Sequence, residues 1–160
     1  MKKLFVGLII ALFLVACGTA PKPRQFQNAF QIAKSFDAVW QATVETFAEL
    51  NILISNKEKA SGLIATDWLK LPGSYDTFDK DNETGYCDCG APAISWGNII
   101  RAGKLNVFVK KTNETLCEVI INAKFEVTWE RESESRSYSC VSTGKLEAEM
   151  FKRISEKVTK

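Results

Sequence analysis

The residues of this 160-residue chain best suited to chemistry are its cysteines, and their spacing favours a disulfide over a metal or redox site. Cys87 and Cys89 have one residue between them, whereas thiolate metal sites and redox pairs usually have two. Cys117 and Cys140 stand much further along the chain. Four such thiols are typical of a disulfide framework in an oxidising compartment. We therefore predict structural bridging and no metal at these positions.

The sequence lacks the one residue type on which most candidate hydrolase mechanisms depend. The chain has no histidine, which excludes Ser-His and Cys-His catalysis, histidine metal sites and a histidine pH switch. Carboxylates gather in one polar stretch, at Asp79, Asp81, Glu83 and Asp88. Their spacing departs from a calcium-binding EF-hand loop, because Gly85 takes the seventh place and another glycine replaces the last ligand. We predict a solvated acidic loop, no enzyme activity and no cofactor.

The N-terminal residues carry a targeting pattern. Lys2 and Lys3 precede an apolar run over residues 4–15, which is too short to span a membrane and has the length of a signal-peptide core. The run ends in Leu-Val-Ala-Cys at residues 14–17, which resembles the lipobox of bacterial lipoproteins. The resemblance implies that residues 1–16 are a signal peptide and that the Cys17 thiol carries lipid, for which palmitate is the expected acyl type.

The same resemblance implies a compartment. Two or three acyl chains anchor a protein stably, whereas one chain binds only marginally. Gly18 follows the cysteine, where an aspartate would favour retention in the inner membrane. For a Gram-negative host, this implies an outer-membrane lipid anchor with the domain facing the periplasm. Residues 17–25 contain two prolines and are predicted to form an extended tether, and residues 26–160 a single domain.

The charge balance limits the choice of partners. Once Lys2 and Lys3 leave with the signal peptide, 19 basic residues face 19 acidic residues. This balance provides neither an electrostatic footprint for nucleic acid nor a polybasic membrane patch. The expected partners are therefore the membrane, through the anchor, and an envelope protein, with no nucleic acid.

Hydrophobic periodicity predicts an α+β domain. Amphipathic helices are expected at residues 35–51 and from a cap at Ser142 or Thr143 to residue 158, and residues 71–98 form a long connection. Strands are expected at residues 26–32, 52–57, 63–70, 99–111, 115–130 and 138–141. The order β-α-β-β-β-β-β-α describes an antiparallel β-meander with two covering helices, which is a helix-grip-like arrangement.

This order is similar to the helix-grip-like domains of the lipoprotein C subunit of the bacterial outer-membrane β-barrel assembly machinery. The resemblance covers residues 36–158, and the cysteine-bearing loop departs from it. The motifs that carry it are Phe-Asp-Ala-Val-Trp at residues 36–40, Lys-Ala-Ser-Gly-Leu-Ile at residues 59–64 and Thr-Gly-Lys-Leu at residues 143–146.

Two functional hypotheses remain. The first is a non-enzymatic accessory or interaction module of the envelope, for which the mixed-charge run at residues 130–136 is either a solvated hairpin tip or a partner-binding site. The alternative is a binding module for a lipid or other small apolar ligand in a cavity between sheet and helix. The residues that would line this cavity, which a plain core also requires, are Trp40, Phe47, Phe125 and Trp129.

Strand pairing predicts which cysteines meet. A turn at residues 112–114 places Val109 opposite Cys117, and a turn near residues 133–134 places Cys140 opposite or diagonal to Val127. About 33 Å of strand then separates Cys117 from Val127, which is too far for a Cys117–Cys140 disulfide. We therefore predict that Cys140 bonds to one cysteine of the pair Cys87 and Cys89, and that Cys117 stays a buried core thiol.

Overall fold

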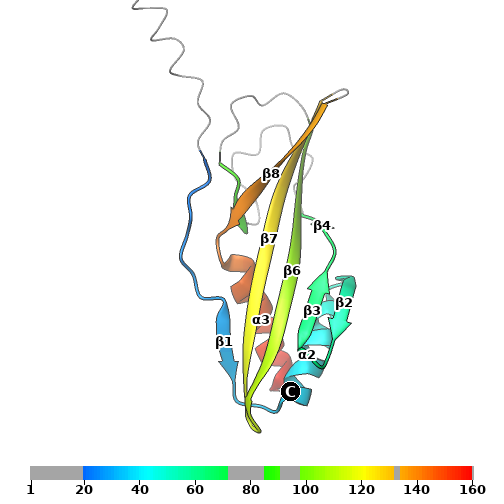
Figure 1. Cartoon of the computed structure of the whole chain (residues 1–160), viewed down its shortest axis with the longest axis vertical. Helices are drawn as coiled ribbons and strands as arrows, with labels where there is room; N and C mark the ends of the chain where they lie inside the picture. The colour runs from blue at the N-terminus through cyan, green and yellow to red at the C-terminus, as the bar shows by residue number, and fades with distance from the viewer. Residues whose placement is uncertain (1–19, 72–84, 91–97, 132–133, 160) are drawn as a thin grey trace, which may run out of the picture.

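The computed structural model describes residues 20–71, 85–90, 98–131 and 134–159 (Figure 1). These residues form an α+β fold in which two helices cover one face of an antiparallel sheet. The helices, α2 (Phe36–Glu49) and α3 (Lys145–Val158), also pack against each other. The coarse prediction of an antiparallel sheet with two helices is confirmed. No helix among the described residues is long and apolar enough to cross a membrane.

The sheet contains more strands than the sequence predicts. The predicted strand at residues 63–70 is split into two, and β5 lies within the predicted long connection. The strands are β1 (Ala29–Ile32), β2 (Ile54–Glu58), β3 (Leu63–Thr66), β4 (Leu69–Lys70), β5 (Cys87–Asp88), β6 (Asn98–Asn113), β7 (Leu116–Arg131) and β8 (Glu134–Ser142). The sheet order is β2-β3-β6-β7-β8-β5, with β1 paired to β7 and β4 to β6. A simple meander therefore does not describe the chain.

The long β6–β7 hairpin is the central element of the sheet and contributes many of the core side chains (Figure 1). Alternate side chains on both strands are buried against the helices, which is the pattern expected of a sheet covered on one side. The buried side chains of this core include Leu105, Val107, Val109, Cys117, Val119 and Ile121 from the hairpin and Val39, Trp40, Phe47, Met150 and Ile154 from the helices.

The hairpin register differs from the prediction by two residues. Lys111, not Val109, lies opposite Cys117, and Val109 lies opposite Val119. The strands continue further than expected, and the turn is held by Asn113, whose side-chain oxygen accepts the backbone N–H of Thr115 at 2.9 Å. This local hydrogen bond is typical of asparagine in turns and shortens the loop.

The break between β3 and β4 has a specific cause at Thr66. Its buried hydroxyl accepts the Leu105 backbone N–H at 3.0 Å and donates to the Asp67 carbonyl at 2.9 Å. A side chain thus replaces one rung of the backbone ladder between β3 and β6, and the chain leaves the sheet before β4 begins.

Strands β1 and β8 share one edge of β7 (Figure 1). Between them, the Ile121 N–H donates to the backbone carbonyl of Asn28 at 2.8 Å, and the Ala123 N–H donates to Glu147 Oε1 at 3.3 Å. Glu147 lies in the first turn of α3 and is only 1% exposed. This carboxylate therefore joins the start of α3 to the fork of the sheet, which is the part of β7 between its pairing with β1 and its pairing with β8.

The start of α3 also differs from the prediction that Ser142 or Thr143 caps the helix. Gly144 occupies the N-cap position with φ 83°, and no side chain caps it. A Cβ at Gly144 would lie 2.5 Å from the Phe26 ring, so only glycine fits this turn. Ser142 acts one step earlier: its hydroxyl accepts the Gly144 N–H and donates to both oxygens of Glu147.

Candidate functional site

The strongest candidate site is a cluster of three cysteines where β5 meets β8. The two strands pair antiparallel, with Cys87 opposite Ser142 and Asp88 opposite Val141. The next residue along, Cys89, therefore reaches Cys140, and the two form a disulfide with Cα atoms 4.2 Å apart. Of the two partners that the sequence allows for Cys140, the structure joins Cys89.

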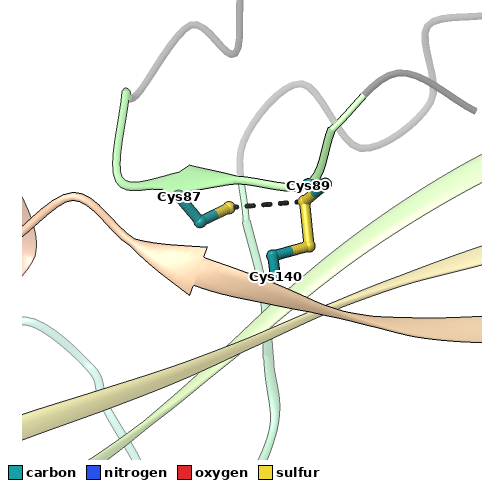
Figure 2. A group of neighbouring side chains, drawn as sticks. All are labelled: Cys87, Cys89 and Cys140. Atoms are coloured by element: carbon teal, nitrogen blue, oxygen red, sulfur yellow. Dashed lines mark hydrogen bonds between the residues drawn. A yellow bond between two sulfur atoms is a disulfide. The ribbon is translucent and has the colours of Figure 1, made fainter. Parts of the chain in front are cut away.

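The third cysteine, Cys87, keeps its thiol beside this disulfide (Figure 2). Its sulfur lies 3.7 Å from Cys89 Sγ, and the three sulfurs lie within 4.8 Å of one another. Because Cys89 Sγ is in the disulfide and has no hydrogen, Cys87 is the donor in this contact. Figure 2 shows Cys87 and Cys89 extending from one segment towards Cys140 on β8. Cys87 is 6% exposed, while both disulfide cysteines are half-buried.

Asp88, between the two cysteines, contacts the N-terminal segment. Its Oδ1 accepts the Gly90 N–H at 2.9 Å, and its Oδ2 accepts the Lys22 N–H at 3.3 Å. These two backbone hydrogen bonds, in this order of effect, lower the pKa of the Asp88 carboxyl, and the charge of Arg24 adds to them. The predicted tether is therefore joined to β5 at Lys22.

The residues before β5 are fastened to the start of α3. The Thr143 hydroxyl donates to the Gly85 carbonyl at 2.6 Å, and the Thr143 N–H donates to the Tyr86 carbonyl at 2.9 Å. The Tyr86 hydroxyl donates to Glu149 at 2.7 Å, and burial together with this carboxylate raises the pKa of Tyr86 to about 12. Lys145 Nζ lies 5.5 Å from the centre of the Tyr86 ring. These contacts fix the residues directly before the cysteine cluster to the start of α3.

Cys117 lies far from this cluster, as a thiol with no exposed surface on β7. Its sulfur donates to the Lys34 carbonyl at 3.4 Å, and burial raises the pKa of the thiol. Cys140 lies opposite Phe125, and the eight residues of β7 from Cys117 to Phe125 span about 26 Å. The two cysteines therefore cannot bridge.

The four aromatic residues of the predicted apolar cavity lie in different surroundings. Trp40 and Phe47 belong to the core cluster between the helices and the sheet, and Phe47 is fully buried. Phe125 is buried over Gly103, where a Cβ would lie 3.0 Å from its ring. Trp129 lies four residues further along β7 and is half-exposed. In the described part of the chain, this core cluster does not include Phe125 or Trp129.

A shallow open pocket of about 340 Å³ lies at the opposite end of the sheet. Phe36, Gly62 and Val109 form its apolar part, and three lysines surround it. Each lysine has an acidic neighbour: Lys59 lies 2.8 Å from Asp37, Lys110 lies 3.9 Å from Glu118, and Lys111 lies 2.6 Å from Glu114. These ion pairs balance the positive charge, so the pocket offers no concentrated charge for an anion.

Other predicted site residues fall outside the described residues. Cys17 is among them, as are Asp79, Asp81 and Glu83 of the acidic stretch. Sequence reasoning also overlooked Glu147 and the role of Asp88. Glu147 had no local signal, because its partner Ala123 is 24 residues away in the chain. The contact of Asp88 with Lys22 had none either, because the two residues are 66 positions apart in the chain.

Compared with known proteins, the chain matches no protein-family model and no curated protein.

Proposed function

We propose that this protein is a lipid-anchored lipoprotein of the bacterial envelope that acts as a non-enzymatic accessory or interaction module. The proposed anchor is Cys17 in the outer membrane of a Gram-negative host, with the domain in the periplasm. The observation that carries the proposal is the path of the chain after the lipobox-like sequence. Residues 20–28 run extended along the surface, and the first residues that pack against the core are Phe30 and Ile32. An acyl chain at Cys17 can therefore enter a membrane without disturbing the fold.

The docked N-terminal segment also orients the proposed anchor. Cys17 precedes Ala20 by three residues, which span at most about 11 Å. The Lys22 N–H is bound by Asp88 close to β5, which supports an anchor at the end of the molecule that carries β5 (Figure 1). The β6–β7 turn lies at the other end of the long axis (Figure 1). We propose that β5 faces the bilayer and that this turn extends away from it.

The composition of the sheet face that the helices leave uncovered favours a protein partner. One row of apolar side chains crosses four strands on the face away from the helices: Leu63, Phe108, Ile120 and Ala29 lie opposite one another in register. Phe108 is 37% exposed, and its three neighbours are half-buried. Polar residues flank the row, with Asn106 and Asn122 on one side and Lys110 and Glu118 on the other. An apolar centre with a polar rim is the usual composition of a protein interface.

The helix-grip likeness belongs to this proposal. Two helices on one face of an antiparallel sheet support it, and the split of β3 from β4 and the shared edge of β7 are departures. The similarity to the lipoprotein C subunit of the β-barrel assembly machinery supports an accessory role. The alternative, an apolar ligand in the core, is less favoured because Trp40 and Phe47 are themselves core residues.

A photo-crosslinking experiment in intact cells tests the interaction module. A photoreactive phenylalanine analogue at Phe108 should give a discrete adduct with one envelope protein. The same analogue at Glu156, an exposed position on α3, is the matched control and should not. If position 108 gives no protein adduct, and native mass spectrometry of the isolated protein instead finds a retained lipid-sized mass, the binding-module alternative replaces this proposal.

A further inference from the structure

The thiol of Cys87 is placed next to the one disulfide of the described residues. Exchange between a thiol and a disulfide requires the thiolate to attack one sulfur while the other departs. The sulfur within contact of Cys87 is Cys89 Sγ, at 3.7 Å, which makes Cys140 the departing sulfur. The structure therefore holds an attacking group, a target and a leaving group in one cluster.

The geometry shows what must move before exchange. In exchange, the attacking sulfur approaches the target sulfur from the side opposite the leaving sulfur. Here all three sulfurs lie within 4.8 Å of one another, so the Cys87 sulfur is not yet in line with the Cys89–Cys140 bond. Rotation of the Cys87 side chain about its Cα–Cβ bond is the smallest change that alters this angle, and it leaves the β5–β8 ladder in place.

We propose that Cys87, Cys89 and Cys140 form a thiol–disulfide exchange site whose reactant is a disulfide-containing molecule. The Cys87 thiol loses its proton to solvent, and its thiolate attacks Cys89 Sγ. The Cys87–Cys89 bond forms, the Cys89–Cys140 bond breaks, and the electron pair leaves on Cys140. The Cys140 thiolate then attacks the incoming disulfide, forms a mixed disulfide and releases the reactant's other half as a thiolate.

Cys87 and Cys140 differ in how accessible they are to a reactant. Cys87 is 6% exposed and cannot meet a bulky reactant directly, whereas Cys140 is half-buried on β8. Exchange therefore transfers the thiol from a buried position to a more accessible one. It also removes the covalent link between Cys89, the residue after β5, and β8. The two-residue pairing of β5 with β8 and the Thr143 hydrogen bonds remain.

Reaction with the aromatic disulfide DTNB tests the site. The full chain would carry Cys17→Ser, so that only the domain cysteines react. The folded protein should release about one thionitrobenzoate per chain, since one thiol is transferred. Peptide mapping at acidic pH should find the reagent on Cys140 and a new Cys87–Cys89 bridge. Reagent on Cys87 or Cys89, or no release from the folded protein, would overturn the proposal.

Two sets of variants separate exchange from a change in folding. Cys87→Ser and Cys87→Ala should both abolish the reaction and keep the Cys89–Cys140 disulfide, which mapping detects directly. Cys117→Ser is the matched control, because it changes the other buried thiol, and it should react like the parent chain. Equal reaction of the Cys87 variants and the parent would contradict the role of Cys87.

Discussion

Asp88 and Lys22 join two parts of the chain that are 66 residues apart: the Asp88 carboxylate accepts the Lys22 backbone N–H at 3.3 Å. Its second oxygen holds the Gly90 N–H, so one side chain between Cys87 and Cys89 orders both its own turn and the N-terminal segment. The cysteine cluster and the segment around Lys22 therefore lie at the same end of the molecule.

Protonation of Asp88 should release the N-terminal segment. Its folded-state pKa is lowered from 3.8, mainly by the Gly90 and Lys22 N–H groups, so the contact is fully present above the unfolded pKa. It is lost as the pH falls through the lower folded-state value. The Lys22 amide resonance should accordingly titrate with a midpoint below 3.8, and Asp88→Asn should abolish this titration. A midpoint at or above 3.8 would show that the hydrogen bond does not form in solution.

Glu147 should be a major source of stability at the fork of the sheet. Glu147→Ala would leave the buried Ser142 hydroxyl and the Ala123 N–H without their acceptor. Each unsatisfied buried group costs about 1–3 kcal/mol, so the free energy of unfolding should fall by at least that amount in a urea titration. Glu156→Ala, an exposed change on the same helix, is the control and should alter it by less than about 0.5 kcal/mol. Equal effects of the two changes would contradict this role.

Gly62 should tolerate no side chain. It has φ +72°, and a Cβ would lie 2.1 Å from the Val109 carbonyl oxygen. Gly85 has a similar φ of +63°, but its Cβ would meet only the Lys145 side chain at 3.9 Å. Gly85→Ala should therefore cost about 1–2 kcal/mol from backbone strain alone, and Gly62→Ala distinctly more. Thermal unfolding of both variants measures the difference, and equal losses would show that the close approach to Val109 is absent.

Long periodic segments could be predicted from the sequence, whereas contacts between distant segments could not. The alternation over residues 115–130 and the helical spacing from Phe36 to Leu50 each contain enough residues to specify an element and its buried face. β5 contains two residues and exists because β8 pairs with it, so no local pattern could reveal it. The Thr66 hydroxyl, which ends β3, depends likewise on Leu105, 39 residues away.

The prediction that Cys117 and Cys140 do not form a disulfide holds even though the predicted β6–β7 register was wrong. The predicted hairpin is two residues out of register, and Cys140 lies opposite Phe125. Eight residues of strand, about 26 Å, still separate Phe125 from Cys117, which is far beyond the reach of a disulfide. The distance along β7 therefore excludes Cys117 as the partner of Cys140 in the predicted register and in the observed one. The choice between Cys87 and Cys89 depends on the pairing of β5, and the sequence left it open.

The proposed lipid anchor is tested by the mass of the mature N-terminus. The protein would be extracted from membranes of expressing bacteria with detergent, and its N-terminal peptide analysed by mass spectrometry. We expect a chain that begins at Cys17 and carries two or three fatty acyl groups, and a Cys17→Ala variant that remains an uncleaved, unacylated precursor. An N-terminus at another residue, or a fatty-acid label that persists on Cys17→Ala, would contradict it.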